Sequence, residues 1–154
     1  MIAKLPSPQK RQIMNIRIKR LHPDAVLPIY AHGPAEDAGL DLRSVERAVL
    51  TPGKTLGVAT GLAIELPPGY EAQIRPRSGL ALKNSITVNF GTIDPGYRGE
   101  IRVIMFNLGT VDYVVEKGDR IAQIVISRYE AIEWAEGDLG DSNRGAGGFG
   151  SSGR

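Results

Sequence analysis

The stretch Gly91-Thr92-Ile93-Asp94-Pro95-Gly96-Tyr97-Arg98-Gly99-Glu100 places one carboxylate at a sharp bend of the chain. Pro-Gly is a strong turn signal, and it follows Asp94 directly. The apolar run at residues 101–106 is typical of a strand. A carboxylate on a turn at the mouth of a strand is well placed to act as a general base. Taken alone, the stretch favours a simpler interpretation, an aspartate that caps its own turn.

Short apolar runs with Gly- and Pro-rich breaks lie on both sides of this turn, and several alternate with polar residues. Such runs at a spacing of roughly 8–12 residues predict an all-β sandwich or barrel. One short helix is expected at residues 78–83, with Ser78 as its N-cap. We expect the first strand, at residues 14–19, to be half-buried. The other expected strands are residues 45–50, 55–59, 62–66, 70–75, 86–88, 101–106, 111–115 and 121–127, with 130–134 as a last candidate.

Composition indicates one ordinary globular domain. The chain has 154 residues, no cysteine, two histidines and a net charge of +2. It therefore lacks thiolate chemistry, has too few histidines for a His-based metal site, and shows no charge excess that would indicate nucleic-acid binding. It has neither a membrane-length apolar run nor a signal-peptide pattern, so we expect no membrane partner and a cytoplasmic location. We expect a flexible extension at 1–14, a β domain at 15–136 and a flexible Gly-rich segment at 137–154.

Polar, Gly-marked stretches interrupt the strands and together hold the groups that phosphate chemistry needs. Arg77, Arg144 and Arg98 can bind phosphate oxygens, and Ser78 and Gln123 can add hydrogen bonds. Three carboxylates accompany them: Asp94 can deprotonate a water, whereas Asp37 and Asp41 could help hold a hydrated divalent ion or anchor a loop. Simpler alternatives stay open. Arg77 and Arg120 could form surface ion pairs, Tyr97 could be a core-edge aromatic residue, and Gln123 could be an ordinary strand residue.

The C-terminal stretch from Arg144 to Gly153 reads R-G-A-G-G-F-G-S-S-G. It is not a P-loop, because it lacks the Gly-Lys-Ser/Thr element and does not lie between a strand and a helix. A mobile strap of this composition could close over a bound nucleotide and exclude water. Arg144 would then contact phosphates and Phe149 would stack on a base.

Taken together, the motifs P-R-S-G-L-A, G-T-I-D-x-x-Y-R-G-E, G-D-R-I-A-Q and R-G-x-G-G-F-G-S-S-G resemble the trimeric dUTPase family in family order. The resemblance runs from about Ile16 to Gly153. It implies a jelly-roll-like β fold and a homotrimer whose active sites each draw motifs from three chains. It also implies magnesium-dependent hydrolysis of dUTP to dUMP and pyrophosphate, which lowers dUTP and supplies dUMP for dTTP synthesis.

The resemblance assigns a role to individual residues. Asp94 would be the base that positions the attacking water, Asp41 would support the site, and Arg144 would be a phosphate-binding finger. Tyr97 would pack under the deoxyribose and leave no room for a 2′-hydroxyl, and Phe149 would cover the uracil. Magnesium would be held mainly by substrate phosphates and water, without direct protein ligands. The expected substrate-binding residues are Arg77, Ser78, Gly79, Asn89, Gly91, Thr92, Ile93, Asp94, Tyr97, Arg102, Gln123, Arg144, Phe149, Gly150 and Ser151.

One segment departs from the family pattern. The stretch L-K-N-S-I-T-V-N-F at residues 82–90 is about two residues shorter than is common in the family, and it forms the hairpin expected to read the uracil edge. The sequence therefore leaves open whether Asn89 or Val88 faces the base. Two other functions stay open: a dCTP deaminase or bifunctional deaminase of the same fold, and a catalytically silent nucleotide sensor or interaction module.

Overall fold

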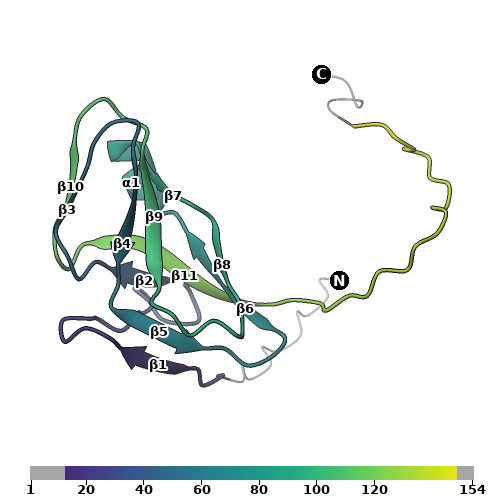
Figure 1. Ribbon diagram of the computed structural model, residues 1–154, viewed down its shortest axis with the longest axis horizontal. Coiled ribbons are helices and arrows are strands. Elements are labelled where there is room, and N and C mark those ends of the chain that lie inside the picture. Colours follow the sequence, from purple (N-terminus) through teal and green to yellow (C-terminus); the bar gives the residue numbers. More distant parts are fainter. Residues whose placement is uncertain (1–12, 149–154) are drawn as a thin grey trace, which may run out of the picture.

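The computed structural model describes residues 13–148, which form an all-β fold of eleven strands and one short helix. The predicted fold class is therefore confirmed. Figure 1 shows the strands gathered into one body, from which the C-terminal segment departs. Within the described residues, no helix combines the length and apolarity needed to cross a membrane.

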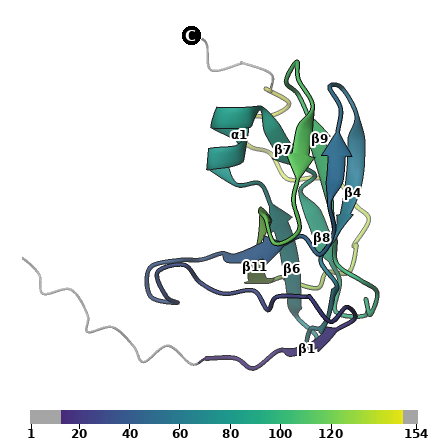
Figure 2. The ribbon, with the colours of Figure 1, turned by 90° about the vertical axis from the view of Figure 1, so that its left-hand side faces the viewer.

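Two antiparallel sheets form most of this body. The larger has the order β2-β11-β6-β8, with strands Leu40–Arg43, Arg120–Arg128, Tyr70–Arg75 and Gly91–Ile93. The smaller has the order β4-β9-β7, with strands Thr55–Ala59, Arg102–Asn107 and Ile86–Val88, which lie side by side in Figure 2. Two ribbons complete the fold: β1 (Arg17–Arg20) with β5 (Leu62–Glu65), and β3 (Ala48–Leu50) with β10 (Tyr113–Val115).

The core lies between the two sheets. Leu42, Ile74 and Ile124 project into it from the larger sheet, and Val58 and Val103 project from the smaller. Ile74 and Val103 alternate with more exposed neighbours along their strands, as the period of two requires. This shared core fixes the face that each strand turns outward, and hence which polar side chains remain available for a site.

The helix α1 spans Ser78–Asn84, one residue longer than predicted. Its N-cap is Arg77, in an extended conformation and without a side-chain cap bond, so the prediction that Ser78 caps the helix is wrong. Ser78 instead occupies the first helical position. At the other end, Ser85 adopts a left-handed conformation with φ of 56° and its N–H meets Leu80 O and Ala81 O, which ends the helix.

Several predicted strands differ from those observed. The strands β2 and β8 were not predicted, because each is only three or four residues long and forms by pairing with β11 or β6. The prediction of a half-buried first strand is wrong, since β1 covers only Arg17–Arg20 and all four residues are exposed. The prediction of a strand at 130–134 is also wrong: these residues are exposed and belong to no sheet. The strands expected at 45–50 and 111–115 are shorter, Ala48–Leu50 and Tyr113–Val115.

The chain beyond β11 runs away from both sheets, as Figure 1 shows. Residues 129–148 contain no helix and no strand. Large apolar side chains in this segment are exposed, and two are almost fully so, Trp134 at 91% and Leu139 at 96%. The segment therefore adds nothing to the core of its own chain.

Candidate active site

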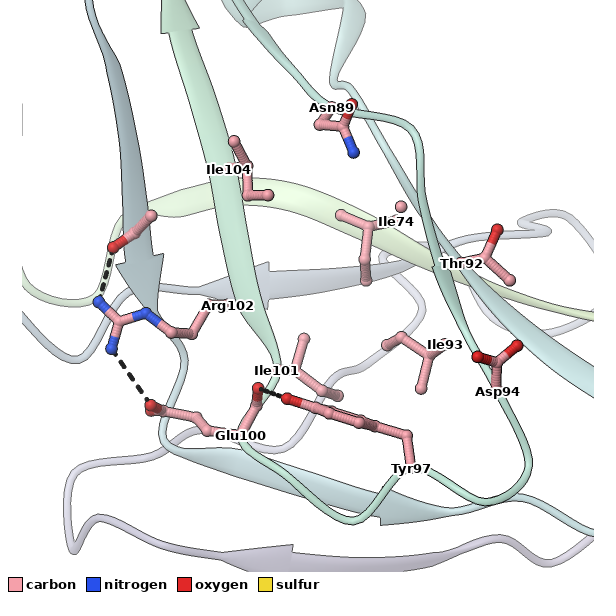
Figure 3. Close-up of a pocket in the computed structure, with 12 residues that line it drawn as sticks. Ile74, Asn89, Thr92, Ile93, Asp94, Tyr97, Glu100, Ile101, Arg102 and Ile104 are labelled. Atoms are coloured by element: carbon pink, nitrogen blue, oxygen red, sulfur yellow. Dashed lines mark hydrogen bonds and ion pairs between the residues drawn. The ribbon is translucent and has the colours of Figure 1, made fainter.

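A pocket of about 500 Å³ lies between β8 and β9, which belong to different sheets. Apolar side chains form its floor, among them Ile74, Ile93 and Ile104. Figure 3 shows polar groups around them, with Asn89 at one end and Tyr97 at the other. The pocket is thus an apolar cavity with a few directed polar groups, the usual character of a small-molecule site.

Asp94 follows the last residue of β8 and stands at the edge of this pocket (Figure 3). The strand buries Ile93, so the next side chain in the alternation, that of Asp94, is exposed. The N–H of Tyr97 donates to the carbonyl of Asp94 at 3.1 Å and closes the turn. Among the described residues, nothing hydrogen-bonds to or pairs with the Asp94 carboxylate. The group is therefore placed by its backbone and free to engage a water or a ligand.

Tyr97 lines the same pocket and is 45% exposed, so it is not a core-edge aromatic residue. Its hydroxyl donates to the carbonyl of Glu100 at 2.9 Å, which holds the ring across the turn. The ring lies against the backbone of Gly99, where an added Cβ would come within 2.6 Å of the ring carbon Cζ. Only glycine at position 99 leaves room for this ring orientation.

Five further predicted substrate-binding residues line the pocket: Asn89, Gly91, Thr92, Ile93 and Arg102. The backbone N–H of Asn89 donates to Ile104 O at 2.8 Å, which ties the short hairpin to β9. Arg102 donates to Gly57 O at 2.7 Å and lies 3.4 Å from Glu100 Oε2. Asn89, and not the buried Val88, therefore reaches the pocket.

A second polar cluster forms around Asp41 on β2. The carboxylate of Asp41 pairs with Arg77 Nε and with Arg120 Nη1, each at 3.3 Å. Arg77 also donates from Nη1 to Arg120 O at 3.0 Å. Both arginines thus form ion pairs, and Asp41 is their shared partner. Among the described residues Arg77 Nη2 has no partner and is open to a further acceptor.

Gln123 joins this cluster through the sheet register, because it lies opposite Asp41 on one side and Arg75 on the other. Its Nε2 donates to Pro76 O at 2.9 Å. Ser78 and Gly79 are exposed at the start of α1, directly after Arg77. The structure therefore brings the predicted residues from three separate motifs to one end of the larger sheet.

Tyr113 on β10 belongs near this cluster, although nothing in its sequence context V-D-Y-V-V distinguishes it. Burial raises the pKa of the Tyr113 hydroxyl above its ordinary value of 10.0; the charge of Asp119 also raises it, and the charge of Arg77 lowers it. Burial and the charge of Asp119 therefore outweigh the charge of Arg77 at this hydroxyl.

The remaining predicted residues lie elsewhere. Asp37 accepts a hydrogen bond from His32 N at 2.6 Å and lies 3.1 Å from His32 Nδ1; these bonds hold the pKa of the Asp37 carboxyl below its ordinary value. It therefore anchors a loop. Arg98 Nη1 donates to two carbonyls of its own turn and Nη2 lies 3.4 Å from Glu65 Oε1, and phosphate binding by Arg98 stays a prediction. Arg144 lies far along the C-terminal segment, with Nε donating to Gly147 O at 2.7 Å. Phe149, Gly150 and Ser151 fall outside the described residues.

Asp94 and the Asp41 cluster lie at opposite ends of β6. Ile93 pairs with Ala72 near the start of that strand, so Asp94 comes level with Glu71. Arg77 follows its far end in extended conformation. Six residues at about 3.3 Å each separate the two positions by about 20 Å. The backbones of Asp94 and Arg77 in one chain are therefore well separated along the sheet.

The carboxylates do not gather into a metal site in the part of the chain that the structure describes. Over residues 13–148, no three His, Asp or Glu side chains gather into a group that could hold a metal ion. Asp41 is the carboxylate nearest to such a role, and both its oxygens already face arginines. A divalent ion at this site would thus need ligands from a bound substrate.

Comparison with known proteins identifies the family. The dUTPase family model matches residues 26–153, and so the chain belongs to the dUTPase family. It is 67% identical to the deoxyuridine 5′-triphosphate nucleotidohydrolase of Solibacter usitatus over 143 residues, 92% of this chain and 97% of that protein. It is 51% identical to the protein of that name from Clostridioides difficile, over 90% of this chain and 98% of that protein.

A solved structure supports the same conclusion. The dUTPase of Staphylococcus bacteriophage 80alpha with dUPNHPP superposes with a TM-score of 0.85 at 30% identity. The match covers 91% of this chain and 99% of that one. The resemblance seen in the sequence motifs therefore extends to the whole fold.

Proposed function

We propose that the protein hydrolyses dUTP to dUMP and pyrophosphate. One observation carries this proposal beyond family membership: at the edge of an apolar pocket, Asp94 stands beside Tyr97 and its carboxylate has no partner among residues 13–148. A silent sensor would have no use for such a carboxylate. Homologues of this chain bear the name of this activity, which supports the same substrate.

In the reaction, Asp94 orients a water molecule and accepts one of its protons. The water oxygen forms a bond to the α-phosphorus, the bond to the bridging oxygen breaks, and pyrophosphate leaves. Most of the rate enhancement comes from positioning and charge neutralisation, as is usual in phosphoryl transfer. Tyr97 lies where it can pack against the deoxyribose and exclude a 2′-hydroxyl.

The phosphates meet the Asp41 cluster. Arg77 keeps Nη2 free for them, and Ser78, Gly79 and Gln123 lie next to it. Mg²⁺ fits this site as a hydrated ion, because it commonly binds through substrate phosphates and few carboxylates. Asp41 would contact it through water, and the ion would neutralise phosphate charge.

We propose that complete sites form between chains of a homotrimer. The separation of about 20 Å between the backbones of Asp94 and Arg77 supports this, since sites shared between chains can bring Asp94 of one chain next to Arg77 of another. The C-terminal segment 137–154 would act as a strap at a neighbouring site, with Arg144 on the phosphates and Phe149, Gly150 and Ser151 over the base. Residues 1–14 would form a separate extension outside the β domain, and the cytoplasm would be the location.

Mixing two inactive variants tests the shared site. Asp94→Asn and Arg77→Ala should each abolish most turnover alone. Refolding them together should restore activity, because some sites then combine an intact Asp94 with an intact Arg77 from another chain. A mixture as inactive as its components would overturn the shared arrangement.

A substrate panel tests the reaction itself. The purified protein with Mg²⁺ is given dUTP, dTTP, dCTP and UTP separately, and release of pyrophosphate and ammonia is followed. Pyrophosphate from dUTP alone is expected, and this result would also show that the short hairpin still selects uracil. Ammonia from dCTP would indicate the deaminase instead, and no product at all would favour a silent module.

A further inference from the structure

Arg98 is built into the turn that carries Asp94. Its Nη1 donates to Pro95 O at 2.6 Å and to Tyr97 O at 2.9 Å. These two carbonyls lie on either side of Gly96, so one guanidinium group spans the bend. A glycine at the bend adds no side chain that could stiffen it. Arg98 therefore adds two contacts to the turn that the bond from Tyr97 N to Asp94 O closes.

Glu65 on β5 connects this guanidinium to the folded body. Its Oε1 lies 3.4 Å from Arg98 Nη2, and its other carboxylate oxygen, Oε2, lies 3.4 Å from Arg17 Nη1. The backbone of Glu65 is held in the pairing of β5 with β1. Arg98 thus joins the turn to a strand that lies outside the site.

Apolar packing does not hold the turn on this side. A cleft of about 560 Å³ separates Pro95 and Gly96 from Leu66 and Pro68, and Glu65 and Arg98 both line it. The turn stands beside an open space, which the Glu65–Arg98 pair bridges. Polar contacts consequently decide where the turn lies relative to β5.

We propose that Arg98, seated by Glu65, is a positioning residue for the Asp94 base. It fixes the course of the chain between Asp94 and Tyr97, and through it the direction of the carboxylate. Tyr97 has its own anchor at Glu100 O, so loss of Arg98 should disturb Asp94 more than the ring. This inference rests on the proposed hydrolysis of dUTP.

The test compares Arg98→Met with Arg17→Met. Both changes remove one positive charge and one partner of Glu65, but only the first removes the bonds to the turn carbonyls. For Arg98→Met, kcat should fall roughly 10- to 100-fold, because small displacements of catalytic groups cost that much. KM should change by less than about threefold, since ground-state binding is retained. Arg17→Met should keep both constants.

Two further variants refine the result. Arg98→Lys can keep one carbonyl bond and the ion pair, so it should recover part of kcat. Glu65→Gln should lower kcat less than Arg98→Met, because the amide oxygen can still accept a bond from Arg98. Hydrogen exchange at the amides of residues 96–99 gives a readout without substrate, and it should accelerate in Arg98→Met but not in Arg17→Met.

Unchanged kcat in Arg98→Met would overturn the inference, and so would an equal loss in Arg17→Met or a loss expressed only in KM. A wild-type protein without dUTP hydrolysis would instead refute the proposed function. In that case hydrogen exchange still decides whether Arg98 holds the turn, so the two failures are distinguishable.

Discussion

Gly39 lies directly against the side chain of Gln123, so closely that a Cβ at position 39 would overlap Oε1 of Gln123. In the pairing of β11 with β2, Gln123 lies opposite Asp41, which follows Gly39 by two residues. Its amide reaches Pro76 O, next to Arg77. The missing side chain of Gly39 therefore lets Gln123 lie within the Asp41 cluster.

Replacement of this glycine should weaken substrate binding. In Gly39→Ala the new methyl group displaces Gln123 from Pro76 O, and kcat/KM for dUTP should fall about 10-fold, equivalent to about 1.4 kcal/mol. Steady-state kinetics of Gly39→Ala and wild type measure the effect, and equal kcat/KM values would contradict it.

The carboxylate of Asp94 should be needed for turnover and not for folding. Asp94→Asn keeps the side chain's size and lies at an exposed position, so the melting temperature should stay unchanged. kcat should fall by roughly 10²- to 10⁴-fold, the contribution of a general base. The exposed Asp112 offers a matched control as Asp112→Asn. Full activity in Asp94→Asn would show that the residue only caps its turn.

Discrimination against ribonucleotides should depend on Gly99. In Gly99→Ala the added Cβ meets the Tyr97 ring and forces it from its present orientation. If Tyr97 excludes the 2′-hydroxyl, the ratio of kcat/KM for dUTP to that for UTP should fall by about an order of magnitude or more, as expected when one contact of about 1.4 kcal/mol or more is lost. A preserved ratio with intact folding would remove Tyr97 from sugar selection.

Truncation after Gly140 should reduce dUTP turnover without changing the free energy of unfolding. The removed residues that the structure describes are mostly exposed and belong to no strand, so the free energy of unfolding should not change. dUTP turnover should nevertheless be severely reduced, because Arg144 and Phe149 are lost with the strap. Urea unfolding and kinetics on one preparation compare the two effects. A truncated protein that fails to fold would contradict the role given to this segment.

The raised pKa of Tyr113 predicts a loss of stability in alkali. In the unfolded chain the hydroxyl ionises near 10.0, whereas burial in the folded state favours the neutral form. The contribution of the neutral Tyr113 hydroxyl to stability is therefore complete below pH 10.0 and is lost as the pH rises through its higher folded-state pKa. The difference between the urea midpoints of wild type and Tyr113→Phe should stay constant up to about pH 8. By about pH 11 the midpoint of the wild type should have fallen relative to that of Tyr113→Phe. A constant difference would contradict this.

Strong alternation made much of the fold predictable. Tyr70–Arg75 was expected with its observed bounds, and α1 to within one residue, because each carries its own periodic signal. Leu40–Arg43 was not expected, since its four residues form a strand only by pairing with β11. The local sequence does not show which distant strand a segment will pair with.

The site, like the fold, could be predicted from the sequence only in part. The turn made Asp94 a candidate base, the resemblance of the motifs assigned Tyr97 to the sugar, and both residues line the pocket. The separation of Arg77 from Asp94 depends on the register of β6 against β8, which no local pattern encodes. The partners of Arg98 were likewise hidden, because Glu65 lies on a strand 33 positions earlier in the chain.

The most direct test of the account is hydrolysis of dUTP in water enriched in ¹⁸O. If Asp94 directs water to the α-phosphorus, the label should appear in the phosphate group of dUMP, and the pyrophosphate should carry none. Label in the pyrophosphate would mean attack at the β-phosphorus and would contradict the assigned geometry. Absence of dUMP would contradict the proposed reaction itself.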